Sequence, residues 1–429
     1  MEPKKILIIT YYWPPAGGPG VQRWLKFVKY LPDFGIQPIV YVPENPTYPI
    51  VDEKLVKEVS DKAIILKHTI FEPYQLASLF SKNKTKKISS GIIPNQKKQS
   101  FLDKTFLWIR GNLFIPDARV FWVNPSVSYL EKYILENKID TIITSGPPHS
   151  LHLIGLELKQ KLNLKWFADF RDPWTTIGYH KSLRLSRFAA KKHKALERQV
   201  LNTADTIIVT SKTTKTEFEA ITSKPISVIT NGYDTEEVGK QTLDLKFSLA
   251  HIGSFLSERN PLILWESLVE LITEIPDFKS HLEIKLIGAV SQEVLETIQQ
   301  FGLNVYLNNL GYVSHVEAIA HQRKSQVLIL IEINSADTKS IIPGKLFEYM
   351  VSNRPIIAIG PRDSDFSEII TNTNTGVFFD YSEKLKLKRV ILDFYNQFLE
   401  GKLQSNGVGL QNYSRRNLTK NLVELLNKM

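Results

Sequence analysis

The chain has 429 residues, of which 43% are hydrophobic and 23% charged; this fits a globular protein of two domains and excludes a disordered chain. It contains no cysteine, which excludes disulfides, thiolate metal sites and cysteine nucleophiles. The formal net charge of +10 predicts an anionic partner: a phosphorylated substrate, phospholipid headgroups or nucleic acid.

The start of the chain carries a short apolar run at 6–9. It lacks the length and the small-residue cleavage site of a signal peptide, and no stretch approaches the roughly 18 apolar residues that span a bilayer. We therefore expect a cytoplasmic protein whose membrane contact, if any, is peripheral at the inner face of the cell membrane.

In the first half of the chain, short apolar runs alternate with segments of helical periodicity. Continuous apolar runs are typical of strands that are buried on both faces of a parallel sheet. The pattern predicts a doubly wound α/β domain over 1–235. The predicted strands are 6–9, 39–42, 141–144, 165–168 and 206–209, and the helices are 21–31, 151–162 and 181–201.

A second series of the same kind predicts another doubly wound domain over 246–405, after a polar joint at 234–245. A C-terminal amphipathic helix follows a Gly/Ser/Asn-rich break at 404–409. The strands are expected at 248–252, 282–287, 327–331, 355–359 and 376–379, and the helices at 261–272, 292–300, 315–322, 345–351 and 413–429. The fold class is therefore two Rossmann-like α/β domains.

The unusual local sequences follow predicted strands. In open parallel sheets ligands bind beyond the carboxyl ends of the strands, so we expect these loops to line the site. They are PPAGGPG at 14–20, SGPPHS at 145–150, DFRDPW at 169–174, HIGS at 251–254 and the segment that begins at Pro343.

The glycines Gly17, Gly18 and Gly20 resemble part of a dinucleotide-binding loop. Counted from Gly18, however, the third required glycine is replaced by Arg23, so NAD binding is disfavoured. The loop either allows close backbone approach to a ligand or is a flexible connector.

Pro343 and Gly344 open an apolar-periodic helix, whose first amides are suited to a phosphate. Lys345 adds positive charge there, and the Glu348 carboxylate, one turn later, is placed to bind a ribose diol. The alternative is a capped surface helix with a Lys–Glu pair.

The segments HIGS (251–254), PGKLFEYM (343–350), ITNGYD (229–234) and FADFRDPW (167–174), in this order and spacing, resemble blocks of the family 4 glycosyltransferases. The resemblance covers nearly the whole chain. It implies the GT-B fold, with two Rossmann-like domains facing a cleft and a C-terminal helix, 410–429, that crosses back to complete the N-terminal domain. It also implies retaining sugar transfer from a nucleoside diphosphate sugar, UDP- or GDP-linked, without a metal or other cofactor.

By position, the resemblance assigns Arg259 to the donor diphosphate and Glu348 to the nucleotide ribose. The donor site would further include Gly253, Pro343, Gly344 and Lys345 in the C-terminal domain. Two departures stand out: Ser254 occupies an arginine position of the family, and Ser340 occupies the first position of a glutamate pair. The catalytic consequence of both serines is left open.

The N-terminal domain would bind the acceptor, a glycan or a lipid-linked sugar. Asp169, Arg171 and Asp172 are candidates for orienting an acceptor hydroxyl or taking its proton, although a structural salt-bridge network explains them equally well. His149 is a candidate hydrogen-bond partner of the donor sugar, with a purely structural histidine as the alternative.

Basic residues concentrate in two segments. Eight Lys or Arg residues lie in 81–110, including the polar loop at 80–100, and six more recur every three or four residues over 181–198. On one helix those six would form a stripe that is either a solvated face or a contact for anionic lipid. The nearby apolar residues suit such a contact: Trp108, Leu113, Phe114, Ile115, Phe121 and Trp122.

The predicted function is sugar transfer in the assembly of a cell-surface polysaccharide or glycolipid. A nucleotide-sugar epimerase of the same fold and a non-catalytic sugar- or nucleotide-binding protein are the alternatives. Nucleic-acid binding has only the charge in its favour, because no recognition motif is present, and we do not expect it.

Overall fold

The computed structural model describes residues 3–72, 101–181, 183–234, 239 and 241–428. The chain forms two compact units, each described here by itself. The N-terminal unit comprises Met1–Thr230 with Arg415–Met429, and the C-terminal unit comprises Asn231–Ser414.

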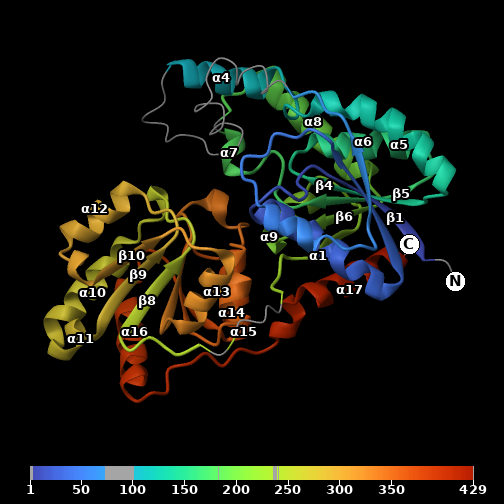
Figure 1. Ribbon diagram of the computed structural model, residues 1–429. Coiled ribbons are helices and arrows are strands. Elements are labelled where there is room, and N and C mark those ends of the chain that lie inside the picture. The colour runs from blue at the N-terminus through green and yellow to red at the C-terminus, as the bar shows by residue number, and fades with distance from the viewer. Residues whose placement is uncertain (1–2, 73–100, 182, 235–238, 240, 429) are drawn as a thin grey trace. The chain divides into compact units, whose positions relative to one another are not determined.

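The N-terminal unit contains a seven-stranded, all-parallel sheet in the order β3-β2-β1-β4-β5-β6-β7, with helices on its faces (Figure 1). Its strands are β1 (Lys4–Thr10), β2 (Ile36–Pro43), β3 (Ile64–His68), β4 (Thr141–Gly146), β5 (Lys165–Phe170), β6 (Thr206–Val209) and β7 (Ile226–Val228). Its helices are α1 (Pro19–Tyr30), α4 (Phe101–Asn112), α5 (Val123–Asn137), α6 (Ser150–Lys161), α7 (Gly178–Lys181), α8 (Arg187–Thr203), α9 (Lys212–Glu219) and α17 (Arg415–Asn427).

The central strand β1 shows why the apolar runs are continuous. Ile6 and Ile8 belong to one buried cluster, whereas Leu7 and Ile9 belong to another. Successive side chains of a strand point to opposite faces, so a sheet covered on both faces needs apolar residues at every position.

Helix α17 returns from the C-terminal unit to the N-terminal unit, beside α1 (Figure 1). Its Leu422 and Leu426 are buried in the same cluster as Ile6 and Ile8 of β1. The Lys4 ammonium also donates to the Leu426 carbonyl at 3.2 Å. The N-terminal core is therefore completed by the last segment of the chain.

The C-terminal unit contains a six-stranded, all-parallel sheet in the order β10-β9-β8-β11-β12-β13. Its strands are β8 (Phe247–Ile252), β9 (Leu282–Ile287), β10 (Leu307–Gly311), β11 (Val327–Ile331), β12 (Ile356–Ile359) and β13 (Gly376–Phe379). Its helices are α10 (Leu262–Glu274), α11 (Pro276–His281), α12 (Gln292–Gln300), α13 (His315–Lys324), α14 (Lys345–Met350), α15 (Asp365–Thr373) and α16 (Lys384–Leu399). The fold class predicted from the sequence is confirmed.

The prediction of one helix over 181–201 is wrong. Arg184 has a left-handed backbone, with φ of 52°, which an α-helix does not accommodate. A new helix, α8, begins after Ser186, whose hydroxyl accepts a hydrogen bond from the Ala189 amide at 3.2 Å. The six basic residues from Lys181 to Arg198 therefore do not lie on one helix.

Candidate functional site

Both sheets reverse their strand order at one point, between β1 and β4 in the N-terminal unit and between β8 and β11 in the C-terminal unit. Ligands of doubly wound folds bind at the carboxyl ends of the strands at such a point. The glycine loop follows β1, His149 follows β4, and Arg259 follows β8. These residues thus follow strands that flank a switch point, whereas Asp169, Arg171 and Asp172 lie at the end of the next strand, β5.

The glycine loop after β1 packs tightly against its neighbours. A Cβ on Gly17 would lie 2.8 Å from Ile50, and one on Gly20 would lie 3.0 Å from the Arg171 guanidinium. Gly18 has φ of +86°, which favours glycine, and is the N-cap of α1. Packing and backbone conformation therefore account for all three glycines.

Asp169, at the end of β5, is fully buried, and its carboxylate is engaged by several hydrogen-bond donors. Its carboxylate accepts hydrogen bonds from Arg23 at 2.8 Å, from the Trp24 indole at 2.8 Å and from the Ser145 hydroxyl at 2.8 Å. The Arg23 charge and these three donors outweigh the effect of burial and lower the pKa of Asp169. This geometry favours the structural salt bridge over proton transfer for this residue.

Arg171 joins three loops at the same edge of the sheet. Its guanidinium donates to the carbonyls of Gly20, Gly146 and Pro147, and its own carbonyl accepts from the Thr210 hydroxyl. The side chain is thereby committed to holding the loops after β1 and β4 together.

Asp172, one residue further on, differs from Asp169 and Arg171 in its contacts. Among the described residues, its carboxylate has no hydrogen-bond donor and no ion-pair partner within 4 Å. Burial raises its pKa, against the opposing effect of Arg171. Of the DFRDPW residues, Asp172 is therefore the carboxylate left available to an incoming group.

His149 lies in a buried aromatic cluster at the N-terminus of α6. Its ring stacks on Trp174, with centroids 5.0 Å apart, and also approaches His152 and Phe170. Neither ring nitrogen has a hydrogen-bond partner among the described residues. Burial lowers the pKa of His149 well below its usual value, so the imidazole is neutral and can either donate or accept.

A charged network that the sequence did not suggest lies nearby. Glu72, which follows β3, is fully buried and accepts from the Tyr11 hydroxyl at 2.7 Å, with the Arg119 guanidinium 3.0 Å away. Only the tertiary structure brings these three residues together, because more than 40 residues separate each from the next in the chain. The network anchors the loop that follows β1.

In the C-terminal unit, Arg259 ends a short 3-10 helix, Ser257–Arg259, after β8. Its guanidinium contacts both carboxylate oxygens of Glu332 at 3.2 Å. Glu332 is fully buried, directly follows β11, and also accepts from the Ile333 amide at 2.8 Å. The sequence analysis missed this glutamate. The available signal was a lone acid at the carboxyl end of a purely apolar strand.

Lys345 lies over the loop that follows β8. Its ammonium is 2.9 Å from the Nε2 atom of His251 and 3.3 Å from the position of a Cβ on Gly253, which has φ of +114°. A side chain at 253 would be strained and would press on the lysine. The glycine therefore keeps the ammonium close to the backbone at the switch point.

Glu348 lies one turn further along α14 and is partly exposed. Its carboxylate accepts from Gln322 at 2.9 Å and lies 3.9 Å from the His315 imidazole, both on α13. It forms no ion pair with Lys345 within 4 Å, so the Lys–Glu pair considered as an alternative is not found. Ser254 is exposed and Ser340 partly buried.

The start of α14 contributes less than the sequence suggested. Gly344 is exposed and is the N-cap, and Leu346 donates its amide to the Pro343 carbonyl at 2.9 Å. With only six residues the helix has a small dipole. Positive charge at this edge therefore comes from the side chains of Arg259 and Lys345.

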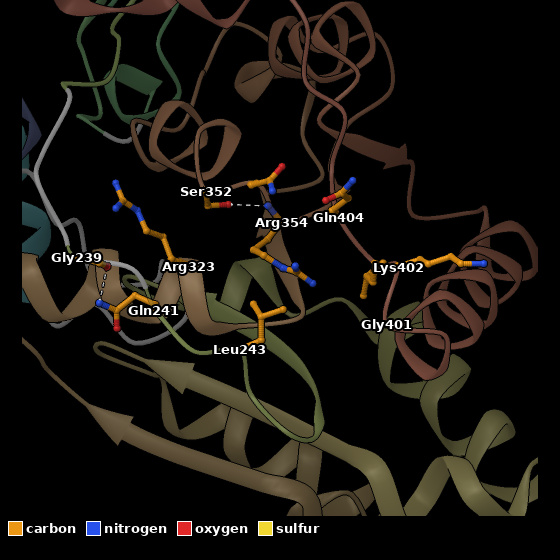
Figure 2. A pocket seen from close by; sticks show the side chains of 11 residues that line it. Gly239, Gln241, Leu243, Arg323, Ser352, Arg354, Gly401, Lys402 and Gln404 are labelled. Atoms are coloured by element: carbon orange, nitrogen blue, oxygen red, sulfur yellow. Dashed lines mark hydrogen bonds between the residues drawn. The ribbon is translucent and has the colours of Figure 1, made fainter.

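The large pocket shown in Figure 2 lies elsewhere in the C-terminal unit. Its lining includes Arg354, which precedes β12, Arg323 near the end of α13, and Lys402 after α16, and its volume is about 750 Å³. The Arg354 guanidinium donates to two oxygens of Gln326, and the Arg354 backbone amide donates to the Ser352 hydroxyl at 3.1 Å (Figure 2). These residues lie at the amino ends of the strands, the edge opposite to the one that carries the predicted donor residues.

The basic residues of α8 are exposed, and Phe188 beside them is 75% exposed. Trp108, Leu113 and Phe121 also face solvent. Ile115 and Trp122 are buried, so their predicted part in a surface contact is wrong: both side chains pack inside the protein. Residues 81–100 of the other basic segment lie outside the described residues.

Within the described ranges, no helix is long and apolar enough to cross a membrane. Nor do any three His, Asp or Glu side chains in that part of the chain form a group that could hold a metal ion.

Comparison with known proteins finds one matching family model. Residues 92–237 match the model of Glycosyltransferase Family 4. The match covers part of the chain, mostly residues of the N-terminal unit. The resemblance recognised in the sequence is thereby confirmed, while no curated protein matches the sequence.

Solved structures show the fold of the whole chain. Sucrose-phosphate synthase from Thermosynechococcus elongatus has a TM-score of 0.61 at 13% identity, over 99% of this chain and 98% of that one. S. aureus TarM, solved with fondaparinux, alpha-GlcNAc-glycerol and UDP, has a TM-score of 0.59 at 13% identity, over 99% of both. An E. coli trehalose-6-phosphate protein bound with UDP-2-fluoro glucose has a TM-score of 0.62 at 9% identity, over 99% of both. The chain thus has the glycosyltransferase-like GT-B fold.

Proposed function

We propose that this protein transfers a sugar from a nucleoside diphosphate sugar to an acceptor hydroxyl, with retention of anomeric configuration. The observation that carries the proposal is the pair of cationic side chains, Arg259 and Lys345, at the switch-point edge of the C-terminal sheet, with Glu348 one turn further along α14. This arrangement suits a diphosphate followed by a ribose.

The chemistry assigned to the C-terminal unit is stabilisation of the leaving diphosphate. Negative charge grows on the bridging oxygen as the bond to the sugar breaks, and cations held in place beforehand stabilise it without reorganisation. Glu332 holds the Arg259 guanidinium through two contacts at 3.2 Å, which fixes its position. Lys345 is held in turn by His251.

The N-terminal unit is assigned to the acceptor. No described residue donates a hydrogen bond to the Asp172 carboxylate, which lies at this edge of the sheet. Its raised pKa suits a hydrogen bond to an acceptor hydroxyl. His149 offers an unpartnered neutral ring nitrogen for a sugar hydroxyl. Arg171 and Asp169 then act as positioning residues that hold these loops.

The donor is tested first by thermal shift against UDP, GDP and their sugars, because a ligand that binds only the folded state raises its stability. UDP leads the panel, since two of the structures with the same fold contain a uridine nucleotide. Transfer is then tested by nucleotide release in the presence of glycan or lipid-linked acceptors. Conversion of the donor to an isomeric nucleotide sugar without net release of nucleotide indicates an epimerase. Binding without turnover indicates a non-catalytic protein, which the serines at 254 and 340 would favour.

We further propose reversible contact with an anionic membrane surface, consistent with a role in polysaccharide or glycolipid assembly. Helix α8 presents Arg187, Lys191, Lys194 and Arg198 to solvent, with Phe188 among them. Each cation near an anionic surface contributes on the order of 1 kcal/mol, and an exposed aromatic ring can enter the interface.

A further inference from the structure

Lys345 has an unusual hydrogen-bond acceptor. The Nδ1 atom of its neighbour His251 lies 3.2 Å from the Ile329 carbonyl, and the Nε2 atom lies 3.4 Å from the Ser254 carbonyl; both carbonyls can only accept. Because the Lys345 Nζ atom is only 2.9 Å from Nε2 and the Nδ1 contact is the shorter carbonyl contact, the geometry favours a proton on Nδ1 and a lone pair on Nε2 that faces the lysine. The His251 ring also stacks on Phe255, with centroids 4.4 Å apart. The lysine is thus held by a neutral, fixed imidazole.

One other cation and two carboxylates act on Lys345, but neither carboxylate contacts it. Arg259 on the loop after β8 repels the ammonium, while Glu332 after β11 and Glu348 on α14 attract it. Both carboxylates, however, are engaged by other groups: Glu332 by Arg259, and Glu348 by Gln322. No carboxylate of the described residues lies within 4 Å of the lysine. Burial, the largest cause, and Arg259 lower the pKa of Lys345 to about 7.

We infer that binding of a nucleoside diphosphate at this site is coupled to the uptake of one proton by Lys345. This inference rests on the proposed function. In the free protein near neutral pH, the amine shares its site with Arg259 and a neutral imidazole, and its charged form is disfavoured. A diphosphate places negative charge in direct contact with the amine, so Nζ takes a proton from solvent and becomes a full ammonium.

The coupling is measured by isothermal titration calorimetry of UDP in buffers that differ in ionisation enthalpy. The dependence of the observed enthalpy on the buffer gives the number of protons bound. With a free-state pKa of about 7, we expect uptake of about 0.9 proton per UDP at pH 8 and about 0.5 at pH 7. The terminal phosphate of UDP, with a pKa of about 6, is deprotonated at pH 8. Affinity should fall almost tenfold from pH 8 to pH 9.

Lys345→Arg is the decisive variant, because arginine stays charged over this pH range. It should bind UDP without proton uptake and with an affinity that no longer depends on pH between 7 and 9. Lys279→Arg, an exposed position on α11, is the matched control and should behave like the wild type.

The outcomes separate the two proposals. UDP binding with uptake below about 0.2 proton at pH 8 overturns the coupling and leaves the proposed function standing. Equal uptake in Lys345→Arg and the wild type places the proton elsewhere and overturns the assignment to Lys345. Failure of every nucleoside diphosphate to bind overturns the proposed function, and this inference with it.

Discussion

Replacement of Asp169 by alanine should destabilise the N-terminal unit strongly. Its carboxylate is fully buried and accepts from Arg23, which is itself 2% exposed. Removing it leaves a buried guanidinium that keeps its hydrogen bond to the Thr230 carbonyl at 3.0 Å but has lost its counter-charge, and leaves the Trp24 indole without its acceptor. Breaking a buried ion pair from one side costs about 3–5 kcal/mol.

The assay is urea unfolding, followed by a signal from the N-terminal unit, since a two-unit chain need not unfold in one step. The matched control is Asp33→Ala, which breaks the exposed Arg416–Asp33 contact and should cost less than about 1 kcal/mol. A double variant, Arg23→Met with Asp169→Leu, should recover much of the loss because no lone charge remains.

A loss below about 1 kcal/mol in Asp169→Ala would refute this reasoning, because the buried charge would then have found another partner. Activity gives an independent check. If Asp169 acts only as a positioning residue, the surviving folded fraction of Asp169→Asn should keep the pH profile of the wild type. A lost ionisation in that profile would restore Asp169 as a proton-transfer candidate.

Four further predictions follow from single sites. Glu348→Ala should weaken donor binding by about 1–3 kcal/mol in calorimetry, with unchanged affinity in a folded variant contradicting the ribose assignment. Arg259→Gln should slow transfer by about 10²-fold and also lower the melting temperature, and adding Glu332→Gln should restore stability but not transfer. Burial lowers the pKa of His152 to about 3, so this residue binds a proton more readily in the unfolded chain and stability should fall as the pH drops below about 6.5. His152 should account for about 2 kcal/mol of the loss at pH 5, so the loss should be smaller by that amount in His152→Gln, while His149 and His251 still contribute theirs. Sedimentation with anionic vesicles should exceed that with neutral ones at low salt and decline with added salt and in Phe188→Ala; no preference would make the basic face merely solvated.

The strands that the sequence predicted and those that it missed differ in their position in the sheets. Every interior strand was found, because burial on both faces requires a continuous apolar run. The three missed strands, β3, β7 and β10, lie at sheet edges and are only partly buried, so polar residues such as Asn308 and Asn309 interrupt them. The helix break at Arg184 was not predicted for a different reason. The basic residues on both sides of it keep helical spacing, and only the backbone conformation reveals the break.

The loops of the candidate site were predictable, because parallel strands end at one edge and the local sequences after them are unusual. Which polar side chain is available in those loops was not predictable. Asp169 and Asp172 are indistinguishable in the motif, yet Arg23, 146 residues away in the chain, saturates the first and leaves the second without a partner. Lys345 is likewise held through a contact with the ring of His251, 94 residues away in the chain. Apolar periodicity is a local property of the chain, whereas the charge state of a buried group depends on partners that only folding brings within reach.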